Sequence, residues 1–131
     1  GFTLKQRISD QAAFIAAGDY HHHIGLNTWE SNNGVSPPDG STGLYHLAIL
    51  YPERKELADA FQRLQSRKIT LTGASDHGVS EALYLDDPDN NGVELYWDRP
   101  QNMWPKDENQ NLTMYTKPLD LRSLLAEVEK K

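Results

Sequence analysis

The chain contains no cysteine, which excludes disulfide bonds and thiolate chemistry. No apolar run approaches the length needed to cross a membrane, and the first residues lack the charged-then-apolar pattern of a signal peptide. Basic residues are also few: 13 stand against 19 acidic ones, for a net charge of −6, and they form no basic stripe. This balance argues against nucleic-acid binding. We therefore expect a cytoplasmic protein that binds neither nucleic acid nor membranes.

At 131 residues, with 37% hydrophobic and 24% charged residues, the chain has the length and composition of one soluble globular domain. Alternating and helical apolar spacings predict three strands, a loop, and then a strand, a helix and three more strands. The expected strands are 2–8, 12–17, 21–29, 45–50, 69–72, 81–85 and 93–97, and the expected helix is 53–67. This order indicates an α+β fold with two copies of one βαβββ module, the first lacking its opening β-α portion.

The predicted domain covers residues 1–100. Residues 1–29 would form the partial first module, residues 30–42 a linker rich in Ser, Asn, Gly and Pro, and residues 43–100 the complete second module. Residues 101–131 form a polar extension that ends in a predicted helix from about Pro118 to Glu129. We expect this extension to pack on the domain or on a partner chain.

Glu94 is a carboxylate inside an otherwise apolar strand. Val93, Leu95 and Trp97 alternate with Glu94 and Tyr96, so one face of the strand can pack on a core while the other face holds Glu94. A carboxylate that becomes buried there is costly unless it is hydrogen-bonded, paired or bound to a metal. Glu94 is therefore a candidate functional residue.

Five histidines fall in three places: residues 21–23, His46 and His77. His46 lies in the first strand of the complete module and Glu94 in its last. One histidine and one carboxylate are two of the three ligands of a 2-His-1-carboxylate triad, which leaves open positions on a metal of the Fe(II) type. The alternative is a hydrogen-bonded strand histidine and a glutamate paired with a cation.

Three segments resemble the vicinal oxygen chelate superfamily of glyoxalases, bleomycin resistance proteins and extradiol dioxygenases. They are Thr42-Gly-Leu-Tyr-His-Leu-Ala-Ile, Asp76-His-Gly-Val-Ser-Glu-Ala-Leu-Tyr-Leu and Asp87-Pro-Asp-Asn-Asn-Gly-Val-Glu-Leu-Tyr. The resemblance covers most of residues 2–100 and is greatest to catechol 2,3-dioxygenase-like proteins. It implies paired βαβββ modules whose mixed sheet curls around a cavity for a metal and a substrate.

The resemblance also implies roles for individual residues. His46 and Glu94 match two metal ligands, Tyr84 matches a tyrosine that contacts a metal-bound catecholate oxygen, and His77 matches a pocket histidine near the substrate. The remaining dioxygenase ligand is a histidine on the opening strand of the first module. We expect this third ligand to be deleted, disordered or supplied by another chain. A module without that portion would expose apolar surface, which favours a homodimer.

The histidines at 21–23 have two interpretations. If Ile24 and Leu26 face the helical layer, His23 points to the concave side, at a position equivalent to that of Glu94 in the other module. Its resemblance to the fourth glyoxalase ligand makes His23 a candidate metal ligand or acid/base residue. His21 would share that face and His22 would point to the opposite one. The alternative is that these are surface or hydrogen-bonded strand histidines.

The resemblance implies an extradiol ring-cleaving dioxygenase that acts on a catecholic substrate with O2. The expected metal is Fe(II), with Mn, Ni or Zn as alternatives, bound by His46, Glu94 and the histidine on the opening strand. His23 is the candidate fourth ligand that a glyoxalase-type site would need. Tyr84, His77 and His23 are the candidate catalytic residues. Two alternatives remain: an isomerase or lyase of the glyoxalase I type on Ni²⁺ or Zn²⁺, and a small-molecule-sequestering protein without turnover.

Overall fold

The computed structural model describes residues 1–129, which form two compact units, residues 1–41 and residues 42 onward. The fold is α+β, as the sequence predicts, and the described residues form two helices and two open sheets. No helix within the described residues is long and apolar enough to span a membrane.

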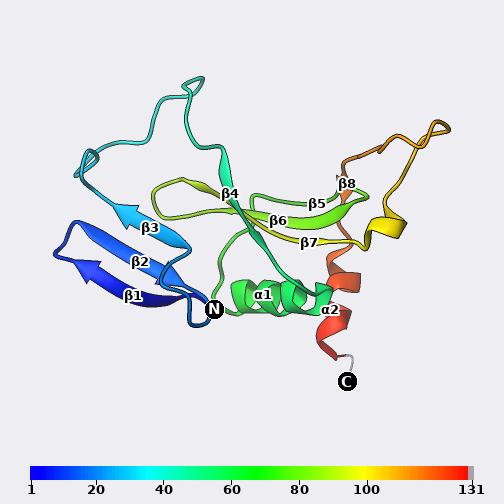
Figure 1. Cartoon of the computed structure of the whole chain (residues 1–131), viewed down its shortest axis with the longest axis horizontal. Coiled ribbons are helices and arrows are strands. Elements are labelled where there is room, and N and C mark those ends of the chain that lie inside the picture. Colours follow the sequence, from blue (N-terminus) through cyan, green and yellow to red (C-terminus); the bar gives the residue numbers. More distant parts are fainter. Residues whose placement is uncertain (130–131) are drawn as a thin grey trace. The chain divides into compact units, whose positions relative to one another are not determined.

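The first unit is a three-stranded antiparallel sheet in the order β1-β2-β3 (Figure 1). Its strands are β1 (Thr3–Ile8), β2 (Ala12–Ala16) and β3 (Ile24–Asn27). The prediction that the third strand begins at residue 21 was wrong. Gly18, at a φ of 61°, turns the chain at the end of β2, and the β2–β3 register begins only at Ile24, opposite Ile15. His23 N donates to Ile15 O at 2.9 Å just before that register, but residues 21–23 belong to no strand. The strand alternation used to assign faces to the three histidines therefore does not extend to His21 and His22.

The second unit is built on a five-stranded mixed sheet in the order β4-β7-β6-β5-β8. β4 runs parallel to β7 and all other neighbours are antiparallel. The strands are β4 (His46–Leu50), β5 (Gly73–Asp76), β6 (Ser80–Asp86), β7 (Gly92–Asp98) and β8 (Lys117–Pro118). The prediction of a strand at residues 69–72 was wrong: the strand after the preceding helix is β5, which begins at Gly73. The reason is the end of the preceding helix, where Lys68 adopts a φ of 57° and Ile69 N donates to Leu64 O at 3.0 Å.

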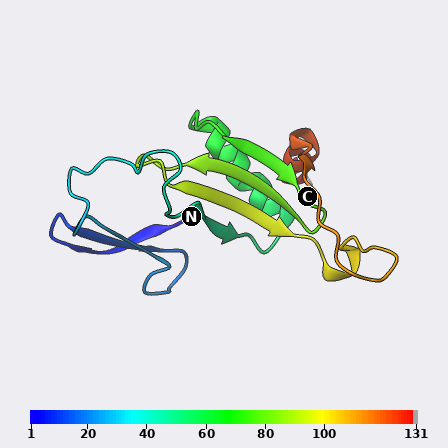
Figure 2. The ribbon, with the colours of Figure 1, turned by 90° about the horizontal axis from the view of Figure 1, so that it is seen from above.

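Two helices, α1 (Arg54–Ser66) and α2 (Leu121–Glu129), cover one face of this sheet (Figure 2). A capping box between Glu53 and Glu56 starts α1. α2 begins three residues later than predicted, because Pro118 pairs in β8 and Asp120 accepts the N–H groups of the first turn. The core between helices and sheet consists of seven buried residues: Leu57, Ala58, Ala60, Phe61, Leu83, Leu95 and Leu124.

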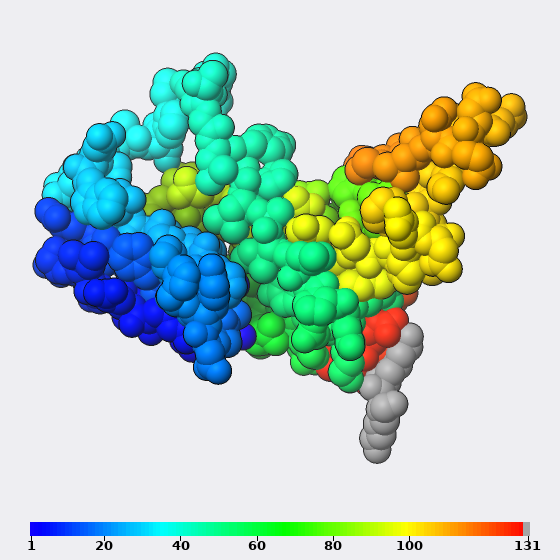
Figure 3. All heavy atoms as spheres, viewed as in Figure 1, coloured from blue at the N-terminus to red at the C-terminus, as the bar shows by residue number. Residues whose placement is uncertain are grey.

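Strand alternation separates this apolar face from a polar one. Leu83 and Leu95 point to the helices, so their neighbours Tyr84 and Glu94 point to the opposite face. Between η1 (Gln101–Met103) and β8, the chain projects from the sheet as an arm, orange in Figure 3. The arm then returns to the sheet and places β8 beside β5. The polar face and the returning arm define the candidate site.

Candidate functional site

His46 and Glu94 meet on the polar face of two parallel strands. His46 pairs with Gly92 in the β4–β7 register, which places Glu94 two residues along on the same face. His46 Nε2 lies 2.9 Å from Glu94 Oε2, and the Glu94 side chain is 14% exposed. Gly92 permits this approach, because a Cβ at that position would collide with the Tyr45 carbonyl and lie 3.0 Å from His46 Cβ. The strand pairing thus brings together two residues that are far apart in sequence.

Tyr84 lies directly opposite Glu94 in the β6–β7 register. Its hydroxyl donates to Glu94 Oε1 at 3.0 Å, so the two carboxylate oxygens of Glu94 serve Tyr84 and His46 separately. Burial of the ring, together with the nearby Glu94 carboxylate, raises the pKa of the Tyr84 phenol to about 12. The phenol is therefore a hydrogen-bond donor, not an anion, at neutral pH.

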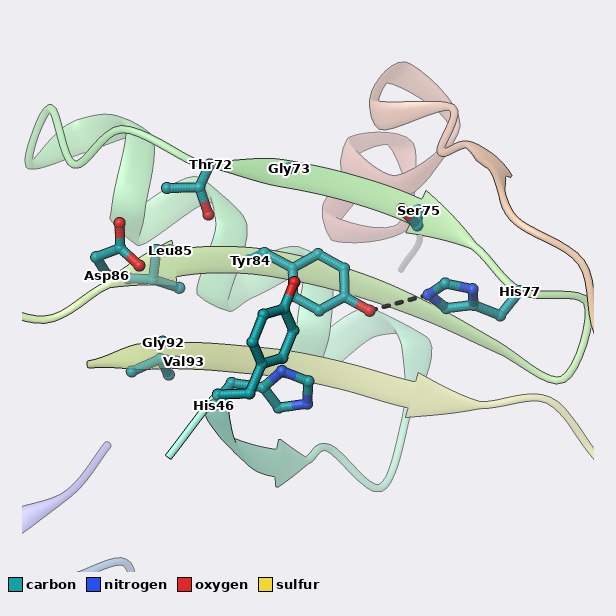
Figure 4. Close-up of a pocket in the computed structure, with 11 residues that line it drawn as sticks. His46, Thr72, Gly73, Ser75, His77, Tyr84, Leu85, Asp86, Gly92 and Val93 are labelled. Atoms are coloured by element: carbon teal, nitrogen blue, oxygen red, sulfur yellow. Dashed lines mark hydrogen bonds between the residues drawn. The ribbon is translucent and has the colours of Figure 1, made fainter. Parts of the chain in front are cut away.

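His77 extends this series of contacts on the other side of Tyr84. Its Nε2 lies 2.9 Å from the Tyr84 hydroxyl, as Figure 4 shows. Its Nδ1 lies 3.2 Å from both the Tyr115 carbonyl oxygen and the Thr116 hydroxyl, at the end of the arm. His46, Glu94, Tyr84 and His77 therefore form one continuous polar chain across the sheet.

A cavity of about 470 Å³ opens beside this chain. His46, Tyr84 and His77 line it together with residues of β5, β6 and β7 and the residues just before β4 and β5: Tyr45, Thr72, Gly73, Ser75, Leu85, Asp86, Gly92 and Val93. In Figure 4, Thr72 and Asp86 lie at the end of the cavity opposite His77. Its volume is within the range of small-molecule sites.

Four of the five residues singled out from the sequence therefore lie together. The fifth, His23, belongs to the first unit, where its Nδ1 accepts the Ala17 N–H at 3.3 Å and its ring contacts Phe2 and Tyr20. Its role at a metal stays a prediction, as do the roles of the other four. Sequence reasoning missed Tyr115 and Thr116, because no strand or helix pattern marks the segment that carries them.

The side chains of His46 and Glu94 have the donor atoms and the separation that a divalent metal requires. Adjacent ligands of an octahedral ion with bonds of about 2.1 Å are separated by about 3.0 Å, and His46 Nε2 and Glu94 Oε2 are 2.9 Å apart. Imidazole and carboxylate are also the donors of a 2-His-1-carboxylate site. Within residues 1–129, no group of three or more His, Cys, Asp or Glu side chains could hold a metal. The described residues thus fit two of three ligand positions.

Curated proteins with similar sequences include three dioxygenases. The chain is 44% identical over 128 residues to a catechol-2,3-dioxygenase of Bacillus subtilis, an alignment that covers 97% of this chain and 44% of that protein. It is 33% identical over 86 residues to biphenyl-2,3-diol 1,2-dioxygenase 2 of Rhodococcus globerulus, covering 65% of this chain and 44% of the relative. The chain therefore spans about half the length of these curated relatives.

Solved structures show the same fold at low sequence identity. A lactoylglutathione lyase from Agrobacterium tumefaciens aligns with a TM-score of 0.53 at 18% identity, covering 73% of this chain and 75% of that structure. A glyoxalase/bleomycin resistance protein/dioxygenase from Alicyclobacillus acidocaldarius aligns with a TM-score of 0.55 at 17% identity, covering 79% and 77%. The family model of the glyoxalase/bleomycin resistance protein/dioxygenase superfamily matches residues 1–95. The chain belongs to this superfamily, as its motifs predicted.

Proposed function

We propose that this chain is part of an extradiol ring-cleaving dioxygenase that acts on a small aromatic diol with O2. The observation that carries the proposal is the polar chain from His46 through Glu94 and Tyr84 to His77 along one cavity. The 44% identity to a protein named catechol-2,3-dioxygenase supports it. Low-identity fold relatives do not discriminate among activities within the superfamily.

His46 and Glu94 would hold a divalent metal, Fe(II) for this reaction, which would supply Lewis-acid chemistry toward the diol and O2. The third ligand would come from a residue outside those described for this unit. The metal fits the donor types of this pair and their separation of 2.9 Å.

Tyr84 and His77 would act on the substrate through hydrogen bonds. The Tyr84 phenol, whose pKa of about 12 keeps it protonated, would donate to a diol oxygen and orient the ring. His77 Nε2, 2.9 Å from the phenol oxygen, would take or give a proton at the cavity side. The cavity beside these residues, about 470 Å³ in volume, would enclose the aromatic ring.

The test uses the full-length protein, loaded with Fe(II) under anaerobic conditions and then exposed to catechols in air. Formation of a coloured ring-cleavage product and consumption of O2 are expected. His77→Gln should lower kcat by about 10²–10⁴, the usual contribution of a general acid or base. Tyr84→Phe removes the hydroxyl that would donate to the diol and should also lower kcat. Its matched control is Tyr51→Phe, because Tyr51 packs against the helix-covered core and should leave kcat unchanged.

Two results would refute the proposal. One is the absence of turnover across a panel of catechols in protein that demonstrably contains iron. The other is a preparation that binds nickel or zinc and isomerises a thiol adduct, which would favour the glyoxalase-type reaction.

A further inference from the structure

The turn that carries His77 is held by hydrogen bonds on both sides of that residue. His77 N donates to Ser80 O at 2.9 Å, and Gly78 N donates to Asp76 Oδ1 at 2.8 Å. These two N–H groups belong to the peptide bonds before and after His77, so both peptide bonds are fixed. Gly78 itself has a φ of 79°, a value that favours glycine. The direction in which the imidazole leaves the backbone therefore depends on the Asp76 side chain as well as on the strands.

The Asp76 side chain lies on the face of the sheet opposite to the imidazole. Asp76 pairs with Glu81 in the β5–β6 register, and Glu81 reaches Arg54 of α1, so both carboxylates are on the helix-covered face. His77, the next residue, lines the cavity on the other face. Asp76 therefore acts on the imidazole through the backbone of the turn.

Arg99 joins the two carboxylates. Its Nη1 and Nη2 donate to Asp76 Oδ1 and Oδ2 at 2.7 and 3.1 Å, and Nη2 also donates to Glu81 Oε1 at 2.8 Å. Like charges directly opposite each other in a sheet repel, and the guanidinium between them offsets that repulsion. The backbone N of Arg99 also donates to Val79 O in the same turn, at 2.8 Å. Arg99 thus holds the His77 turn from the helix-covered face with both its side chain and its backbone.

We propose that Asp76 and Arg99 are positioning residues that fix the His77 imidazole against the Tyr84 hydroxyl from the far face of the sheet. His77 Nε2 lies 2.9 Å from that hydroxyl (Figure 4), and a rotation of the turn would lengthen this contact. A displacement of about 1 Å can cost about 10²-fold in rate where a group must meet its substrate in one geometry. The catalytic consequence rests on the proposed function, whereas the geometric one concerns the folded protein alone.

The test compares Asp76→Ala with Glu127→Ala in the full-length protein. Each substitution removes a carboxylate from one arginine of the same ion-pair network. Asp76, 24% exposed, lies 2.7 Å from Arg99, and Glu127, 19% exposed, lies 2.7 Å from Arg54. Both arginines keep Glu81 as a partner. Glu127 belongs to α2, so its loss should lower the stability without reaching the His77 turn.

Asp76→Ala should lower kcat toward catechol by up to about 10²-fold with little change in KM, because Asp76 is not one of the described residues that line the cavity. In metal-free protein, the nuclear Overhauser effects between the rings of His77 and Tyr84, whose centroids lie 6.4 Å apart, should weaken. Glu127→Ala should keep the wild-type kcat and Overhauser effects, although urea denaturation should show a similar loss of stability in both variants. Arg99→Lys is the second variant. Lysine keeps the charge but lacks the fork that spans the two carboxylates, so the same Overhauser effects should weaken.

A wild-type kcat with unchanged Overhauser effects in Asp76→Ala would overturn the proposal. Equal losses of kcat in Asp76→Ala and Glu127→Ala would also overturn it, because the effect would then follow stability alone. If Asp76→Ala does not fold, unchanged Overhauser effects in Arg99→Lys overturn it instead. An iron-loaded wild type that cleaves no catechol refutes the proposed function, and the Overhauser effects still decide what positions His77.

Discussion

Glu81→Ala should destabilise the second unit strongly. The Glu81 side chain is 6% exposed and accepts from Arg54 Nε at 2.7 Å and from Arg99 Nη2 at 2.8 Å. Removing one partner of a buried ion pair costs about 3–5 kcal/mol, because the remaining charge is left without compensation. Arg54 keeps Glu127 and Arg99 keeps Asp76 after the substitution, so the lower end, about 3 kcal/mol, is expected.

Urea denaturation followed by circular dichroism measures this loss, and a fall of about 10–20 °C in melting temperature should accompany it. Glu81→Gln keeps the size and one acceptor oxygen and should cost less than alanine. Asp10→Ala is the control for an exposed pair, since its side chain and that of Arg7 are 102% and 60% exposed. That control should change the free energy of unfolding by no more than about 1 kcal/mol. A Glu81→Ala protein within about 1 kcal/mol of wild type would refute the assignment of Glu81 as a buried charged anchor.

Two further predictions concern pH. Burial raises the pKa of Asp76, but the hydrogen bond and charge of Arg99 and the Gly78 N–H outweigh it and hold the pKa below its usual 3.8. The fold therefore favours the ionised form of Asp76, so Asp76→Asn should be less stable than wild type at neutral pH. This difference in the free energy of unfolding should shrink as the pH falls below 3.8. A difference that stays constant with pH in urea denaturation would contradict the prediction. For Tyr84, a raised pKa means stability that is present below pH 10 and lost as the pH rises through about 12. In metal-free protein, Glu94→Gln should lower this pKa while leaving it above 10, since burial is the larger cause; an unchanged ultraviolet titration of the phenol would contradict that coupling.

The elements with strong periodicity were predictable from the sequence. The alternation of apolar residues around Glu94 located β7 and its polar face, and the helical spacing of Leu57, Ala60, Phe61 and Leu64 located α1. β5 was misplaced because residues 69–72 are apolar or β-branched enough to resemble a strand. That local preference is overridden by the turn at the end of α1, which the sequence pattern does not reveal.

The grouping of His46, Glu94, Tyr84 and His77 was expected from the resemblance, and their contacts come from strand register. Register places Tyr84 opposite Glu94 and His46 one pleat away across a parallel pair. Spacing in the sequence cannot give these distances, since His46 and Glu94 meet only because β4 and β7 are neighbours in the sheet.

The contact between Thr116 and His77, at the end of the polar chain, could not be predicted from the sequence. Thr116 reaches His77 from 39 residues further along the chain, through a two-residue strand that includes Pro118. A strand that short has no detectable alternation, and proline cannot donate to a ladder. The contact is determined instead by the return of the arm over Gly78, where any side chain would displace Tyr115. A polar segment outside the recognisable modules therefore completes the hydrogen bonding of a histidine inside them.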